Sequence, residues 1–300
     1  MSVDKNEDQV DGGVIRDDRV LLVTRVAAAT VAIVLGLAWW VLYLDPVEGA
    51  ERFAWPVRPE MTAVLMGSGY GSAVIFFLAV LVGRRWHRVA LGFLPTTVFI
   101  WLVSIATLLH WDRFSHGEPL FLIWAWTYAI TAFAVPVLWL LNHRRDPGRA
   151  EERDATIGGV LRTVLLGAGL VLAAIALVMY IAPAVVIDVW PWQLTELTAR
   201  TVAAFVSLPA VAWLAMAFDR RWSAARVMVM TIAVGLVMLL IGVGRTWDDF
   251  DQENWLTYVY VGGLAATLGL LIAMAAWLER SAARRVPGEE PSAGVPGGRA

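Results

Sequence analysis

The sequence predicts an all-α membrane protein with eight transmembrane helices, arranged as two parallel four-helix repeats. Three observations support this fold class: the composition, the lengths of the apolar runs and an internal repeat. Of the 300 residues, 59% are hydrophobic and 17% are charged, whereas soluble domains average about 45–50% apolar and about 25% charged residues. The charged residues also gather in short stretches between long apolar runs, which is typical of a chain that crosses a bilayer repeatedly.

Eight apolar runs are long enough to cross the hydrocarbon core of a bilayer, which needs roughly 20 helical residues. Backbone groups in lipid must bond within their own segment, so these runs are expected to be helices. None carries an Asp, Glu, Lys, Arg or His in its central third, which argues against a proton-coupled pump or a charge-lined channel. The predicted spans are residues 20–44, 61–83, 89–110, 120–142, 159–182, 198–218, 227–244 and 256–278.

The basic residues predict the orientation. Nineteen of the 24 Lys and Arg residues lie on one side of the predicted spans and five on the other. Because loops rich in Lys and Arg stay on the cytoplasmic side, we expect both termini in the cytoplasm. The polar, mostly acidic first 19 residues do not resemble a cleaved signal peptide.

The position of each tryptophan along its predicted span indicates its surroundings. Indole rings prefer the membrane interface, so the twelve tryptophans near span ends are predicted to be bilayer anchors, Trp55, Trp86, Trp192 and Trp222 among them. Four others lie deeper and are expected to pack between helices: Trp101, Trp124, Trp126 and Trp213.

An internal repeat divides the chain. Residues 60–114 align without a gap on residues 196–250, with 13 of 55 positions identical, and upstream Trp55-Pro56 is aligned with Trp190-Pro191. Each repeat holds four spans, an even number, so both enter the membrane in the same direction and the repeat is parallel. We expect repeats at 20–142 and 159–278, a cytoplasmic linker at 143–158, and disordered ends at 1–19 and 279–300.

A polar site is predicted at the outer rim. Each half places a Glu and an Asp at equal distances from a cytoplasmic turn, so the two carboxylates reach the same height at the outer membrane edge. The candidate residues are Glu60, Asp112, Glu196, Arg200 and Asp248. They could bind a cation or a cationic ligand. Alternatively, the two Glu residues could stabilise helix N-termini, the two Asp residues could pair with Arg113 or Arg245 or face water, and Arg200 could pair with Glu196.

Other motifs indicate packing rather than chemistry. Gly67 and Gly71 have the GxxxG spacing that lets membrane helices approach closely. The chain has no cysteine and four histidines, and it lacks HExxH and Gly-rich nucleotide motifs. We therefore expect no metal, no cofactor and no nucleic-acid partner.

The stretch Trp190-Pro-Trp-Gln-Leu-Thr-Glu-Leu-Thr-Ala-Arg200 resembles a signature of uncharacterised polytopic membrane proteins of GC-rich Gram-positive bacteria. That resemblance implies a bacterial plasma-membrane protein and carries no assigned activity.

Three hypotheses for the function remain open. The first is an accessory or scaffold subunit that binds a membrane-protein partner or a second copy of itself, because no catalytic constellation is evident. The second is a carrier or channel for a small neutral or apolar solute. The third is a membrane enzyme that acts on a lipid-linked substrate at the outer rim. The sequence leans away from an enzyme.

Overall fold

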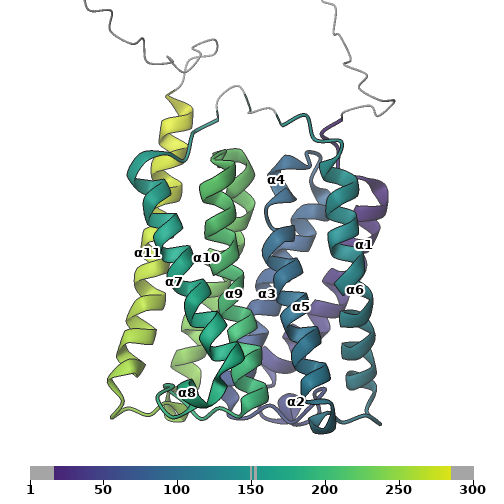
Figure 1. Ribbon diagram of the computed structural model, residues 1–300, viewed down its shortest axis with the longest axis vertical. Coiled ribbons are helices and arrows are strands. Elements are labelled where there is room, and N and C mark those ends of the chain that lie inside the picture. Colours follow the sequence, from purple (N-terminus) through teal and green to yellow (C-terminus); the bar gives the residue numbers. More distant parts are fainter. Residues whose placement is uncertain (1–16, 149–150, 152–153, 285–300) are drawn as a thin grey trace, which may run out of the picture.

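A computed structural model describes residues 17–148, 151 and 154–284, and this part of the chain is a bundle of helices (Figure 1). In these described residues, eight long apolar helices could each cross a membrane. In chain order they are α1 (Leu22–Trp39) with its π-helical continuation η1 (Trp40–Leu44), α3 (Glu60–Val82), α4 (His87–Ala90) followed by α5 (Phe93–Leu109), α6 (Pro119–His143), α7 (Gly159–Ile181), α9 (Glu196–Asp219), α10 (Trp222–Arg245) and α11 (Trp255–Ala283).

The predicted all-α membrane fold is confirmed, and each observed span overlaps its predicted run. Two ends differ by more than two residues: α10 begins at Trp222 rather than at 227, and α11 continues past 278 to Ala283. The expectation of a disordered tail from 279 is therefore wrong for residues 279–283, because helical hydrogen bonding continues beyond the apolar run. The predicted disorder of residues 1–16 and 285–300 falls outside the described residues.

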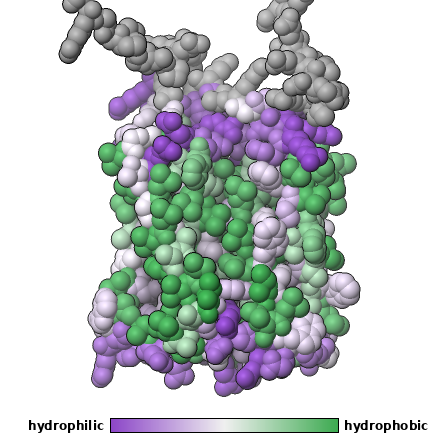
Figure 2. Space-filling model, in the orientation of Figure 1, coloured by the Kyte–Doolittle hydropathy of each residue, from purple (hydrophilic) through white to green (hydrophobic). Residues whose placement is uncertain are grey.

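The surface of the bundle is an apolar band between two polar ends (Figure 2). Both ends of the described chain lie at one end of the bundle, which we call the arginine-rich end (Figure 1). Four short helices lie at the opposite end, the outer end: α2 (Glu48–Glu51), η2 (Trp111–Arg113), α8 (Pro183–Ile187) and η3 (Trp247–Asp249).

The two halves of the chain interlock rather than sit side by side. In the first half, α3 and α5 have few direct contacts with each other, although they are consecutive spans. Instead α3 packs against α1 and against α10 of the second half, while α9 packs against α7 and against α5 of the first half. Helices α6 and α11 are peripheral and pack mainly on α5 and α10.

Matching hydrogen bonds join the halves on both sides. The hydroxyl of Tyr43 donates to the carbonyl of Met238 at 2.8 Å, and the hydroxyl of Tyr180 donates to the carbonyl of Leu102 at 2.6 Å. Each bond runs from the end of the first span of one half to a central helix of the other. In both halves, therefore, a tyrosine at the end of the first span makes a hydrogen bond to the backbone of a central helix of the opposite half.

Each half also has a cluster of four aromatic side chains at its outer end. In the first half Trp55 packs against Phe114 and Trp124, with ring centroids 5.1 and 5.0 Å apart. In the second half Trp192 makes the corresponding contacts, at 5.3 and 5.2 Å. The structural counterpart of Trp55 is thus Trp192, whereas the sequence alignment paired it with Trp190. The clusters are Phe53, Trp55, Phe114 and Trp124, and Trp190, Trp192, Phe250 and Tyr260.

Depth alone did not predict the surroundings of the tryptophans. Trp55, Trp86, Trp192 and Trp222 are at most 3% exposed, so they pack inside the protein and are not the predicted bilayer anchors. Conversely, Trp101 and Trp126 were expected between helices but are 49% and 66% exposed. The height of a residue along a span follows from the sequence, but the face it occupies depends on how the helices are arranged.

The glycine pair on α3 faces another helix of the same chain. A methyl group on Gly67 would lie 2.7 Å from Cβ of Tyr43, and one on Gly71 would lie 2.6 Å from the ring of Trp39. Both neighbours belong to the first span, in α1 and η1. The glycine face is therefore used within the chain and is not free for self-association.

Candidate functional site

A groove of about 530 Å³ opens at the outer end between the two halves. Ligand pockets commonly enclose about 300–1,000 Å³, so its size suits a small molecule or a few residues of a peptide. The first half contributes the loop between η1 and α3, and the second half contributes the residues before α9 and part of η3. Its lining includes Glu51, Arg58, Glu60, Gln193, Thr195 and Asp249.

Asp249, one of the residues that line the groove, connects the two halves. Its Oδ2 atom accepts a hydrogen bond from the backbone N–H of Met61 at 2.7 Å. This N–H belongs to the first turn of α3, whose unpaired N–H groups and helix dipole favour a carboxylate. Sequence patterning predicted the neighbouring Asp248 instead, which is exposed and does not line the groove. The residue aligned with Asp249 in the first half is Arg113, so the repeat gave no signal for it.

The charges of the groove are unbalanced toward the negative. Arg58, the basic residue in the lining, forms an ion pair with Glu51. In the described part of the chain, neither Glu60 nor Asp249 has an ion-pair partner. Two carboxylates without a cationic partner therefore line one groove, and only one of them, Glu60, was predicted.

Glu196 and Arg200 belong to a different group. Arg200 donates hydrogen bonds to Glu196 at 3.1 Å and to Nε2 of His110, in the first half, at 2.7 Å. Because a guanidinium can only donate, Nε2 must accept and His110 must be neutral. Burial and the charge of Arg200 lower the pKa of His110, which favours the same neutral form. The predicted ion pair exists, and it extends to a histidine that joins α9 to the end of α5.

The remaining two predicted acids stand apart from the groove. Asp112 is exposed and lies 3.5 Å from the guanidinium of its neighbour Arg113, and Asp248 is exposed. Of the five candidate residues, the groove thus includes Glu60 alone. The arrangement offers a binding surface for positive charge rather than a matched acid and base.

A second group of polar residues lies at the arginine-rich end. Glu151, in the predicted linker, accepts hydrogen bonds from Arg88 at 2.7 and 3.0 Å and contacts the ring of His87, which also contacts Asp18. The Arg88 guanidinium holds the pKa of Glu151 below its usual value. Burial would raise the pKa of Asp18, but its hydrogen bonds from His87 outweigh burial and lower it. These contacts fasten the linker and the start of the described chain to the α3–α4 turn.

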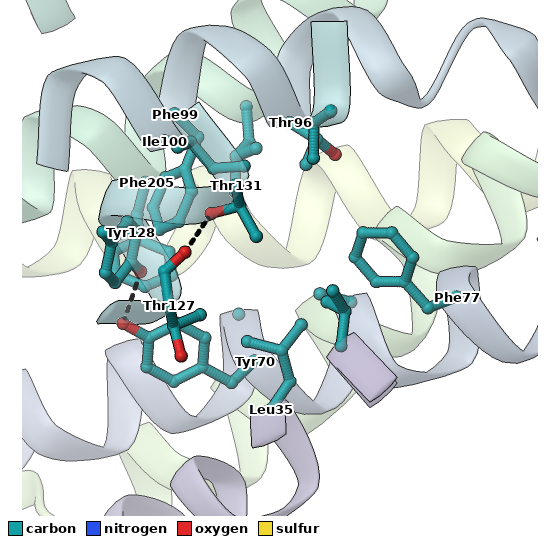
Figure 3. A pocket seen from close by; sticks show the side chains of 15 residues that line it. Leu35, Tyr70, Phe77, Thr96, Phe99, Ile100, Thr127, Tyr128, Thr131 and Phe205 are labelled. Carbon is teal, nitrogen blue, oxygen red and sulfur yellow. Dashed lines mark hydrogen bonds between the residues drawn. The ribbon is translucent and has the colours of Figure 1, made fainter. Parts of the chain in front are cut away.

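An apolar cavity lies within the membrane-spanning part of the first half (Figure 3). It encloses about 60 Å³ between α1, α3, α5 and α6, and α9 closes one wall with Phe205 and Leu208. Tyr70 and Tyr128 point toward each other across it, with their hydroxyl oxygens 3.1 Å apart. The sequence could not pair these tyrosines, because they lie on different helices.

No group of three or more His, Asp or Glu side chains in the described residues is arranged to hold a metal ion. Comparison with protein-family models, with curated proteins and with solved structures found no match. The assignment of a function therefore rests on the geometry of the molecule.

Proposed function

We propose that this protein is an interaction subunit of a bacterial plasma membrane, and that its outer groove receives a positively charged segment of a partner membrane protein. In this proposal the arginine-rich end and both termini face the cytoplasm, so the groove opens outside. The eight apolar spans make the chain an integral membrane protein, and the uneven distribution of arginine supports this orientation.

The observation that carries the proposal is the pair of carboxylates without a cationic partner, Glu60 and Asp249, in a groove shared by both halves. Because both halves build the groove, an occupant would contact the first half and the second half at once. A guanidinium or ammonium group there would gain charge-assisted hydrogen bonds, each worth about 1.5–3 kcal/mol. The surrounding walls, which include Val57 and Leu194, would accept the apolar stem of such a side chain.

The proposal is tested with the full chain in lipid nanodiscs and two short peptide amides as probes. One peptide contains two arginines, and in the other citrulline replaces them, which keeps the shape and removes the charge. We expect the arginine peptide to bind at least fivefold more tightly than the citrulline peptide. We also expect Glu60→Gln and Asp249→Asn each to remove most of that preference.

Asp248→Asn provides a matched control, because it removes the same charge one residue away but outside the groove lining. Asn at 249 can still accept the hydrogen bond from Met61, so α3 should keep its first turn. Equal binding of the two peptides would contradict the proposal. So would an equal loss of affinity in Asp248→Asn and Asp249→Asn.

The geometry favours neither a carrier nor an enzyme over this role. A membrane enzyme at the outer rim would need its acids close together, whereas the structure separates Asp112 and Asp248 from the groove and pairs Glu196 with Arg200.

A further inference from the structure

The cavity between Tyr70 and Tyr128 continues toward the lipid. A second recess of about 40 Å³ shares Leu35, Tyr70, Thr127 and Tyr128 with the first and is otherwise lined by residues of α1, η1 and α6 with Phe53. Two residues at its edge, Leu37 and Ile123, are 55% and 42% exposed on the membrane-facing surface. The two recesses therefore form one cleft that opens to the hydrocarbon between α1 and α6, which we call the tyrosine cleft.

The gap between α1 and α6 has a structural cause. The hydrogen bonds that join these helices all involve Asn142 at the arginine-rich end, which binds the N–H of Leu21 at 3.0 Å and the hydroxyl of Thr24 at 2.6 Å. Helix α6 packs mainly on α5 instead, and near the outer end the indole N–H of Trp124 donates to the hydroxyl of Thr107 at 3.1 Å. The helices are thus joined at one end and leave the cleft open beyond it.

The tyrosine cleft contains hydroxyl donors that make no hydrogen bond within the protein. Tyr70 and Tyr128 are 3% and 7% exposed, and only one of their two O–H groups can be used in the bond between them. The other O–H group makes no hydrogen bond to any described residue. The hydroxyl of Thr127 also makes no hydrogen bond there, whereas Thr96 and Thr131 each donate to a carbonyl of their own helix. Two O–H donors in an apolar cleft favour an occupant that offers oxygen acceptors.

The depth of the tyrosine hydroxyls in the membrane limits which kinds of molecule could bind in the cleft. Tyr70 lies beside the midpoint of the 23-residue helix α3, about 15 Å along the axis from its start at Glu60. The hydrocarbon core is about 30 Å thick, so the hydroxyls lie near its centre. Phosphate and ester oxygens of phospholipids stay at the edges, and their acyl chains carry no acceptor. An isoprenoid quinone, in contrast, is soluble in the hydrocarbon and carries two carbonyl acceptors and no donor.

We infer that the tyrosine cleft binds the ring of an isoprenoid quinone, with a quinone carbonyl accepting hydrogen bonds from the tyrosine pair and Thr127. Because the two recesses, of about 60 and 40 Å³, are too small to enclose a whole ring, only one edge of the ring enters the cleft and the rest of the molecule lies in the lipid outside its mouth. Phe205, whose ring is 4.8 Å from Phe99 and 5.6 Å from Tyr70, forms an aromatic wall against which the ring packs. The site is separate from the outer groove and does not depend on the function proposed for it.

The test uses the full chain in nanodiscs of phosphatidylglycerol and phosphatidylethanolamine without quinone. The probe is a photoreactive azidoquinone with a ten-carbon tail, and decylubiquinone is the competitor. We expect the probe to label peptides from α1, α3 or α6. We also expect decylubiquinone to reduce this labelling in a saturable way. The double variant Tyr70→Phe with Tyr128→Phe should weaken binding about tenfold, because it removes the spare donor without changing the shape.

Each single tyrosine variant should weaken binding less than the double variant, because one O–H donor then remains for the quinone. Tyr258→Phe, an exposed tyrosine on α11, is the control and should bind as the parent does. Ala73→Leu, which fills the first recess, should abolish labelling. This variant tests the inference by itself if the double variant fails to fold. Three results would each overturn the inference. The probe could label other parts of the chain, excess phosphatidylglycerol could remove the labelling as well as decylubiquinone does, or the double variant could bind with unchanged affinity.

Discussion

Replacing Gly67 by alanine should separate the first span from α3, because the added methyl group meets backbone rather than a movable side-chain tip. The methyl carbon would lie 2.7 Å from Cβ, 2.9 Å from the backbone nitrogen and 3.1 Å from Cα of Tyr43. Carbon atoms prefer a separation of about 3.5–4.0 Å, so η1 or α3 must move by several tenths of an ångström or more. Small residues are favoured where membrane helices approach this closely.

The expected loss of stability follows from two opposing contributions. Overpacking costs about 1–3 kcal/mol, while alanine is favoured over glycine in a helix by about 1 kcal/mol. Gly36→Ala on α1 measures the second contribution alone, because nothing lies within 4 Å of the added methyl group. The free energy of unfolding of Gly67→Ala should therefore fall about 1–3 kcal/mol below that of Gly36→Ala.

Equilibrium unfolding in mixed micelles with increasing dodecyl sulfate, followed by circular dichroism, measures this difference. Both variants keep the same number of helical residues, so a single optical signal serves for both. Equal unfolding free energies for the two variants would refute the argument, since the close approach of α3 and η1 would then carry no energetic weight.

Two further predictions concern the ends of the bundle. Because burial and the charge of Arg200 lower the pKa of His110 in the folded protein, the unfolded state binds protons more readily. The stability that comes from the link to Arg200 should therefore be complete above about pH 6.5 and decline as the pH falls below it. The parent should therefore lose thermal stability between pH 7.5 and 5.5 more than His110→Gln does, and equal pH dependence would contradict the role of this histidine. The orientation is checked with single cysteines in this cysteine-free chain: Arg84→Cys and Arg220→Cys should react with an impermeant thiol reagent only after the membrane is opened, while Gly117→Cys should react in intact cells. Labelling of Arg84→Cys and Arg220→Cys on opposite sides would exclude the proposed topology.

The spans were predictable because lipid acts on each segment separately. A backbone in hydrocarbon must satisfy its own hydrogen bonds, so a sufficient apolar length is enough to indicate a helix. The helix ends were harder to place, because the α10 start at Trp222 and the α11 end at Ala283 involve polar residues that form helix outside the apolar run.

The candidate site was predicted only in its position along the membrane normal. Helical rise predicts that Glu60 lies at the end of its span opposite the arginine-rich end, and in the structure Glu60 lines the groove at that end. Its partner carboxylate is Asp249, one residue from the predicted Asp248, and the difference is a rotation within the short helix η3 that no periodicity reveals. The link from Arg200 to His110 could not be predicted either, because it joins spans from different halves.

The sequence by itself determined that this protein lies in a membrane, how many spans it has and the height of each residue along the membrane normal. These properties depend on local composition, and the bilayer enforces them along one direction. Only the tertiary structure decided which face of each helix is buried, so Trp86 lies inside the protein and Trp126 faces lipid. The same holds for the outer groove and the tyrosine cleft, since lateral packing between helices depends on shape complementarity among side chains distant in the chain.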